Sequence, residues 1–515
     1  MKTSILRNGL KRSFIVLLTM IISTIFIFSF HTGHVHAEII DNQCNGDHTG
    51  WTPLSNVGGA LPAGNYYLTG DVTLLTNIVI SDGTINLDLN GNILTGAIGS
   101  DASIFRVIGG TLNIYDCNSE NKVHSYKIKE VKANSTQDLY YGNSSYSNKL
   151  FQRYYDFNDV GDGVIVGGII TGGHKYATKT NLKNYFEYAG GGSAILVGEQ
   201  YGTASEGTVN VYGGTFSGNT VTALSQWGGK RERSGTIAVI DGGTLNFFDG
   251  QIVGNSSRYG GAGVFAFGTS SYPARANIYG GLITDNYSLE HVYNYTPAST
   301  LNGGVGAAIY SENIQSNDSI VSIKGAPQIS DNITYNMTQN KNIKANVSFS
   351  TESLNQIKIT GLLYTEVNSV KTYAKIGLWG GAVNLLTSGY STNGNTHEEV
   401  NKIFFADNLT QAVAYNTSNG ELKYVTSNLY TLTYNSNSGT GSTTSTVSVV
   451  DKISISESLF QRNGYLFLSW NTKADGTGTK YLPNEVITLT ANQTLYAIWK
   501  ASSYRINYWT NGGTL

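Results

Sequence analysis

The sequence predicts an all-β chain, most of which folds as a parallel β-helix. Only 13% of the 515 residues are charged, and the chain contains 61 Gly and 34 Tyr but only 6 Pro. This composition favours strands and tight turns over helices. Short strand-like segments separated by glycine pairs recur as near copies along much of the chain. Stacked repeats of this kind bury a continuous core that no single repeat could bury alone.

Residues 1–37 are expected to be a signal peptide. An apolar run extends over residues 14–30, and Val35-His36-Ala37 supplies small residues at the −3 and −1 positions of a cleavage site. The basic residues that precede the run are Lys2, Arg7, Lys11 and Arg12. An uncleaved membrane anchor is the alternative, since the run approaches the length of a membrane span.

The charge balance argues against nucleic acid as a partner. Removing residues 1–37 leaves all 35 acidic residues but only 29 of the 33 basic ones, so the mature chain is mildly acidic. The one basic cluster, residues 230–233, is short and contains Glu232. Nucleic-acid-binding proteins need a more extended basic surface.

The two cysteines leave two interpretations open. Export would permit a disulfide between Cys44 and Cys117, but their spacing does not show whether they meet. Cys44 with His48 would supply only two of the four ligands of a usual zinc site. We therefore expect no metal site here.

The clearest repeats lie between residues 209 and 286. "VNVYGGTFSGN" at 209–219 recurs as "LNFFDGQIVGN" at 245–255 and as "ANIYGGLITDN" at 276–286. Looser copies lie at 321–332 and 164–173. A second, glycine-rich element alternates with these copies and is found at 190–198, 260–268 and 303–313.

Each clear copy ends in asparagine. The residues concerned are Asn219, Asn255, Asn286 and Asn332, at spacings of 31 to 46 residues. Asparagine tolerates left-handed backbone and bonds to neighbouring main chain. Identical amide side chains on stacked strands can also form a hydrogen-bonded ladder, so these residues are expected to mark one corner of successive coils.

A parallel β-helix fits these repeats better than a β-propeller, whose repeats usually carry longer strands and a fixed aromatic signature. Residues 51–118 share the same residue pattern, in which apolar and polar residues alternate between glycine turns. This segment ends with the stretch "GGTLNIYDC" at 109–117. This pattern resembles the pectin-lyase-like domains of bacterial surface proteins. The resemblance implies a right-handed β-helix of unassigned activity, here over residues 38–395, followed by a β-rich connector at 396–428.

An insertion near residues 119–163 interrupts the repeats with charged and aromatic residues, including "YYGNSSYSNKLFQRYYDF" at 140–157. Loops that project from a β-helix often carry binding sites, and their rings could stack on sugars. Alternatively, the tyrosines pack the insertion onto the surface of the β-helix.

The residue pattern changes again at residue 429. A run from Phe460 through "RNGYLF" to Trp470-Asn471 is followed by "WNTKADGTGTKY" at 470–481 and "TLYAIW" at 494–499. This order resembles the internalin-type B-repeat, also called the Listeria–Bacteroides repeat. The resemblance implies a small β-grasp-like domain at 429–500 that serves as a spacer or interaction module and has no catalytic residues.

The chain ends with the start of a similar unit. Residues 504–508, "YRINY", align with residues 430–434, "YTLTY". Residues 501–515 are therefore expected to begin a truncated second B-repeat that is poorly ordered here.

No residue pattern points to catalysis. The acids of the repeats are isolated among Gly, Asn and apolar residues, and are Asp241, Asp249, Asp285 and Asp331. Asp285 and Asp331 stand where other copies have Gly218 and Gly254, which favours a role in the turn. His174 and His291 lack carboxylate partners in sequence. We therefore expect no catalytic, cofactor-binding or metal-binding residues and no cofactor.

Together these features predict a non-catalytic, exported bacterial cell-surface protein. Its partners would be the bacterial envelope and an unidentified host or environmental glycan or protein, with the B-repeats as spacers. The alternatives are a polysaccharide lyase or glycosidase built on the β-helix, and a purely structural stalk.

Overall fold

The computed structural model describes most of the chain after the expected signal peptide. The described residues are 46–55, 59–97, 103–132, 150–175, 191–198, 206–221, 234–257, 260–289, 306–312, 319–336, 341–349, 356–379, 386–408, 411–426, 430–440, 446–449, 452–458 and 460–502. The signal peptide at 1–37 and the second-repeat strand at 504–508 lie outside them.

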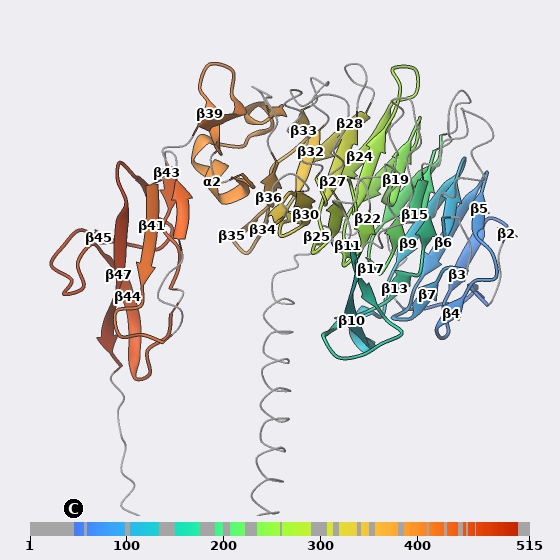
Figure 1. The fold of residues 1–515 in the computed structure, drawn as a ribbon, viewed down its shortest axis with the longest axis horizontal. Helices are drawn as coiled ribbons and strands as arrows, with labels where there is room; N and C mark the ends of the chain where they lie inside the picture. The colour runs from blue at the N-terminus through green and yellow to red at the C-terminus, as the bar shows by residue number, and fades with distance from the viewer. Residues whose placement is uncertain are drawn as a thin grey trace, which may run out of the picture.

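Most of the described chain is a stack of β-strand coils, coloured blue to orange in Figure 1. A complete coil contains four short strands, one on each of four faces. Strands of successive coils pair in parallel along every face, which confirms the expected parallel β-helix and excludes the antiparallel blades of a propeller.

The strands of the four faces follow one another in chain order. Face 1 contains β1 (Thr52–Pro53), β3 (Gly64–Tyr67), β6 (Thr84–Asp88), β9 (Thr111–Tyr115), β16 (Thr208–Val211), β20 (Thr244–Phe247), β24 (Ala274–Ile278), β28 (Ser319–Ile323), β33 (Ile357–Ile359) and β37 (Thr387–Ser388). Face 2 contains β4 (Val72–Thr73), β7 (Ile93–Thr95), β13 (Ile169–Thr171), β17 (Thr215–Ser217), β21 (Gln251–Val253), β25 (Leu282–Thr284), β29 (Gln328–Ile329), β36 (Lys375–Leu378) and β38 (Phe404–Ala406). Face 3 contains β14 (His174–Lys175), β18 (Thr220–Val221), β22 (Ser256–Ser257), β26 (Tyr287–Leu289), β30 (Ile333–Asn336) and the antiparallel β31 (Lys341–Lys344). Face 4 contains β2 (Gly59–Ala60), β5 (Ile78–Ile80), β8 (Phe105–Val107), β15 (Gly191–Val197), β19 (Ser234–Ile240), β23 (Val264–Phe267), β27 (Ile309–Glu312) and β32 (Val347–Phe349).

The alternation seen in the sequence places one side of each face 1 strand in the core. In β20, Leu245 and Phe247 are fully buried, while Thr244 and Asn246 point outward and are partly exposed. The buried side chains of successive coils form one continuous hydrophobic core, which extends from Leu54 to Leu422.

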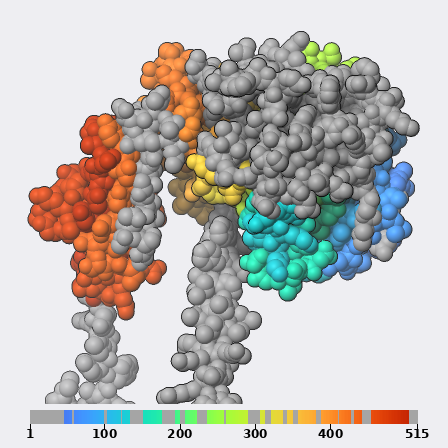
Figure 2. All heavy atoms as spheres, viewed as in Figure 1, coloured from blue at the N-terminus to red at the C-terminus, as the bar shows by residue number. Residues whose placement is uncertain are grey.

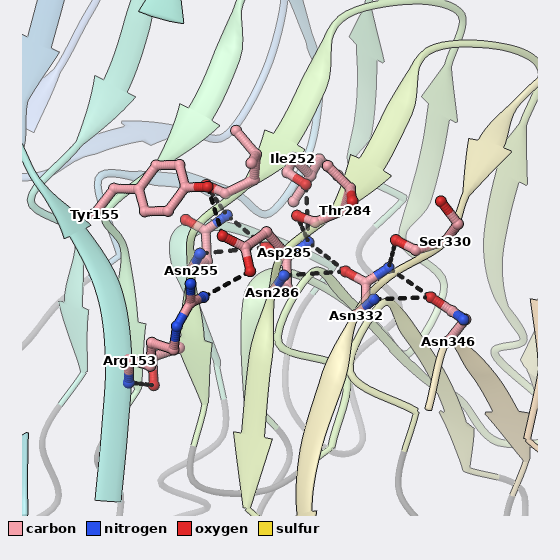
Figure 3. Close-up of polar contacts among 12 residues, drawn as sticks. Arg153, Tyr155, Ile252, Asn255, Thr284, Asp285, Asn286, Ser330, Asn332 and Asn346 are labelled. Atoms are coloured by element: carbon pink, nitrogen blue, oxygen red, sulfur yellow. Dashed lines mark hydrogen bonds and ion pairs between the residues drawn. The ribbon is translucent and has the colours of Figure 1, made fainter. Parts of the chain in front are cut away.

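The asparagines that end the repeats form the expected ladder between faces 2 and 3 (Figure 3). Each amide donates from Nδ2 to the Oδ1 of the asparagine in the next coil, over Asn219, Asn255, Asn286 and Asn332, at 2.8 to 3.1 Å. Every one of these side chains is fully buried. The same Nδ2 groups also donate to main-chain carbonyl oxygens, for example those of Ile252 and Thr284 at Asn286.

The ladder continues beyond the repeats that the sequence revealed. Asn332 donates to Asn346 at 2.8 Å, and Asn346 donates from its Nδ2 and its main-chain N to the two carboxylate oxygens of Asp407, at 2.6 Å each. A carboxylate can accept but, when ionised, cannot donate, so Asp407 completes the ladder without leaving a donor unpaired.

The residues before these asparagines have left-handed backbone. Gly218 and Gly254 have φ of 70° and 63°, and Asp285 and Asp331 have φ of 49° and 59°. The expected turn role of the two aspartates is therefore confirmed.

The insertion forms a separate three-stranded antiparallel sheet. Its strands are β11 (Leu150–Asp156), β10 (Val123–Lys132) and β12 (Gly163–Val166), and it follows the short 3-10 helix η1 (Ser119–Asn121). Strand β11 contacts β22 and β26 on face 3, so the insertion packs along the side of the β-helix.

The last coils carry short additions. These are the hairpin β34 (Tyr364–Val367) and β35 (Val370–Tyr373), the 3-10 helices η4 (Ser391–Asn393) and η5 (His397–Glu399), the helix α2 (Val400–Ile403), and the hairpin β39 (Gln411–Asn416) and β40 (Glu421–Thr426). Val413 and Leu422 of the second hairpin belong to the core of the β-helix. Within the described ranges, no helix has the length and apolar character needed to cross a membrane.

The C-terminal module has its own core around the fully buried Trp470. Its five-stranded sheet has the order β42 (Thr446–Val449), β41 (Tyr430–Asn435), β47 (Gln493–Ala501), β44 (Tyr465–Asn471) and β45 (Lys480–Tyr481), and β43 (Lys452–Ser454) pairs separately with β46 (Val486–Thr488). Strands β41 and β47 are parallel, and the other pairs are antiparallel.

Asn286→Ala should destabilise the β-helix strongly. The change removes donors to Ile252 O, Thr284 O and Asn332 Oδ1 and leaves buried groups unpaired, at a cost of about 2–4 kcal/mol. The partly exposed Asn277, which donates to Asn246 at 2.9 Å on the outside of face 1, is the matched control, and Asn277→Ala should cost about 1 kcal/mol or less. Urea unfolding checks both values, and equal losses would contradict the importance of the buried ladder.

Asp407 should make stability depend on pH. Burial raises the pKa of its carboxyl from 3.8 to about 6, so the folded state binds the proton more tightly than the unfolded state. Its contribution to stability is therefore fully present below pH 3.8 and is lost as the pH rises through 6. The stability of the wild type relative to Asp407→Asn should fall by about 1–3 kcal/mol between pH 4 and pH 7. Urea unfolding of both proteins across this range measures the difference, and a constant difference would contradict the assignment.

Candidate ligand-binding cleft

A cleft of about 1100 Å³ lies between the C-terminal coils of the β-helix and the C-terminal module. One wall comes from the turns after β20 and β24, from β29, and from β35, β36 and α2. The other wall comes from residues 454–457 and Asn484 of the module. Figure 2 shows this module, in orange and red, at the end of the β-helix. The volume is slightly above the roughly 300–1,000 Å³ typical of ligand pockets.

A column of aromatic rings leads into the cleft. Tyr115, Tyr212, Phe248 and Tyr279 occupy the same position in successive coils, with ring centroids 5.0, 4.9 and 5.1 Å apart. The parallel, in-register pairing of face 1 creates the column, because neighbouring strands lie about 4.8 Å apart. Its last two rings, Phe248 and Tyr279, line the cleft.

Two lysines of the cleft lie close to tyrosine rings. Lys402 Nζ lies 5.0 Å from the ring centroid of Tyr373, and Lys371 Nζ lies 3.9 Å from that of Tyr364. Lys371 also lies 3.4 Å from Glu399 Oε1. Its hydrogen bond to Tyr364, assisted by Tyr373 and Glu399, raises the pKa of Lys371 above the usual value.

This arrangement suits binding better than proton abstraction. A lysine that acts as a general base needs a lowered pKa, whereas that of Lys371 is raised. The amine of Lys371 therefore stays protonated and paired with Glu399. The hydroxyl group of Thr365, which also lines the cleft, has no hydrogen-bond partner in the described part of the chain.

The aspartates singled out in the sequence are held in different environments. Asp285 accepts hydrogen bonds from Arg153 Nη1 at 2.6 Å and from Tyr155 Oη at 2.5 Å (Figure 3). Asp331 pairs with Lys344 at 2.7 Å on the surface. Asp249 accepts from the main-chain N of Gly250 at 2.8 Å and lines the cleft. Asp241 is buried at the end of face 4.

The histidines and the cysteine singled out in the sequence have other partners where the structure describes them. His48 Nε2 lies 2.7 Å from Asp88 Oδ2, and the His48 ring stacks on Tyr67. Cys117 is disulfide-bonded, and Cys44, the only other cysteine in the sequence, lies outside the described residues. His174 Nδ1 lies 2.7 Å from Thr220 Oγ1, whereas His291 lies outside the described residues. Among the residues described, no three His, Cys, Asp or Glu side chains form a group that could hold a metal ion.

The tyrosines described in the insertion pack it against the β-helix. Tyr155 is 7% exposed and stacks on Tyr126 with centroids 3.8 Å apart. Burial and the carboxylate of Asp285 raise the pKa of Tyr155, so the phenol remains a hydrogen-bond donor. The residues at 140–149, where sugar contact was also considered, lie outside the described ranges.

Sequence reasoning missed the cleft. Its lysines come from β35, β36 and α2, and their sequence context carries no motif. The glycine pairs of the repeats did align Phe248 with Tyr279, a signal that could have revealed the aromatic column.

Comparison with known proteins identifies the C-terminal module. Residues 430–498 match the Listeria-Bacteroides repeat domain, as the sequence motifs predicted. A protein of Evansella cellulosilytica, named as a Gly-rich membrane protein, is 39% identical over 54 residues. That match covers 10% of this chain and 6% of the relative. No solved structure matches.

Asp285→Gly should loosen the insertion. Glycine suits the left-handed backbone, so the change removes mainly the contacts to Arg153 and Tyr155. Hydrogen bonds to charged groups contribute about 1.5–3 kcal/mol, so amide exchange in β11 should become about tenfold faster or more. Hydrogen exchange followed by mass spectrometry measures this. Asp331→Gly is the matched control, because it removes an exposed ion pair with Lys344 and a hydrogen bond from Ser330 Oγ and no contact to the insertion. An equal effect on β11 would contradict the role of Asp285.

Proposed function

We propose that this chain is an exported bacterial surface protein whose β-helix, of the pectin-lyase-like kind, binds an external glycan or protein without cleaving it. The cleft with its aromatic and lysine residues is the observation that carries the proposal. The Listeria-Bacteroides repeat, whose family is typical of cell-surface proteins, and the short match to a membrane protein support the location. The expected signal peptide at 1–37 is consistent with it.

The geometry of the cleft favours binding over turnover. Its aromatic rings offer apolar edges, and its lysines and hydroxyl groups offer donors that can orient a ligand. Asp249 and Glu457 are the acids that line it, but they lie on opposite walls and belong to different domains. An adhesive role, with the repeat module next to the site, fits these features best.

Tyr279→Ala should weaken binding without unfolding the protein. Tyr279 is partly exposed and ends the aromatic column, and loss of an aromatic contact of about 0.5–1.5 kcal/mol lowers affinity about twofold to tenfold. The measurement is retention of purified 38–515 on immobilised glycans and proteins. Tyr465→Ala, at a 38% exposed tyrosine of the module outside the cleft, is the control and should bind like the wild type.

Two results would count against this proposal. If no glycan or protein in the panel were retained, the β-helix would be better explained as a stalk. If new reducing or unsaturated ends appeared during incubation with a glycan, the lyase or glycosidase alternative would replace it.

A further inference from the structure

The repeat module forms a rigid wall of the cleft. Its segment at 454–456 is fixed by hydrogen bonds from Trp470 Nε1 to Ser456 O at 2.8 Å and from Ser456 N to Tyr434 Oη at 2.9 Å. Asn484 N donates to Ile455 O at 2.8 Å. The wall is therefore attached to the core of the module and does not depend on a ligand to order it.

The two domains are also in contact at the edge of the cleft. Helix α2 of the β-helix, which carries Lys402, contacts β43, which leads into the segment at 454–456. A ligand that fills the cleft would consequently touch both domains at once.

The opposite wall is equally well supported. Gln328 Nε2 donates to the main-chain O of Tyr373 at 3.0 Å, and Lys375 N donates to Pro327 O at 3.0 Å. These bonds attach β35 and β36 to the preceding coil. The rings and amines of this wall are therefore held in place before a ligand arrives, which lowers the entropic cost of binding.

The charges of the cleft favour an anion. Lys371, Lys375 and Lys402 line it against two acids, Asp249 and Glu457. Of the three lysines, Lys371 is paired with Glu399, whereas no carboxylate of the described residues lies within ion-pair distance of Lys375 or Lys402. A local excess of lysine is notable because the chain as a whole carries a net negative charge.

The remaining lining is suited to a sugar chain. Hydroxyl and amide side chains, including those of Ser369, Thr372 and Asn484, line the cleft with Phe248 and Tyr279 and can bond to the hydroxyl groups of a sugar. An acidic peptide would use the lysines but has fewer hydroxyl groups to pair with these polar side chains.

We infer, on the basis of the proposed function, that the ligand is an anionic polysaccharide that binds between the β-helix and the repeat module, the B-repeat at 430–498. The sugar chain lies against the edges of Phe248 and Tyr279, and its negative groups contact Lys375 and Lys402. The B-repeat is then half of the binding site and has a role beyond that of a spacer.

Glu457→Lys on the full 38–515 chain tests the repeat wall. The change replaces a negative group with a positive one in the cleft, so affinity for an anionic chain should rise about twofold to fivefold, as expected for exposed charge pairs. Glu206→Lys makes the same change of charge at an exposed residue outside the cleft and should leave affinity unchanged. If both variants behave alike, the B-repeat is not part of the site.

The ligand class is tested with polysaccharides that differ only in charge. The probes are dextran against carboxymethyl-dextran and hyaluronan against its methyl ester, with poly-glutamate as an acidic peptide. The charged sugar of at least one pair should bind more tightly than its neutral form, more weakly at high salt, and more weakly to Lys402→Gln by about twofold to fivefold.

The outcomes separate the two proposals. Equal binding of neutral and charged sugars would overturn the anionic class but preserve the proposed function. Equal or tighter binding of poly-glutamate would overturn the sugar class. Failure of every probe, together with failure of the wider glycan and protein panel, would overturn the proposed function itself.

Discussion

The buried asparagine ladder is the constraint on which the rest of the structure depends. A coil of short strands has corners where main-chain groups lack strand partners, and buried groups of this kind must be paired. Each ladder amide satisfies carbonyl groups of its own coil and of the preceding one, while its oxygen accepts from that coil as well. Coils are thereby attached to one another in a single register.

The common register has consequences on the outside of the stack. A second ladder, which passes from Asn65 to Asn277 on face 1, follows from the same alignment, as does the aromatic column that ends at Tyr279. The cleft thus depends on the ladder indirectly, because a shift of one residue in any coil would turn its outward side chains toward the core.

The positions that replace glycine show how the fold acquires further contacts. At the left-handed corner, Asp285 keeps a backbone that glycine adopts in other coils and adds a carboxylate that holds the insertion through Arg153. Asp331 makes the same replacement but pairs with Lys344 at the surface. Aspartate in place of glycine therefore has a different effect in each coil. It attaches the insertion where Arg153 lies nearby, and it forms a surface ion pair where Lys344 lies nearby.

The sequence alone determined the parallel β-helix, the ladder from Asn219 to Asn332 and the repeat domain at 430–498, because each depends on local turn chemistry repeated at recognisable positions. Only the tertiary structure decided the end of the ladder at Asp407, the attachment of Arg153 to Asp285 and the meeting of Lys402 with the repeat module. These contacts join residues far apart in the chain, and loops of unequal length decide which residues of distant coils become neighbours. The sequence has no periodicity from which these contacts could be predicted.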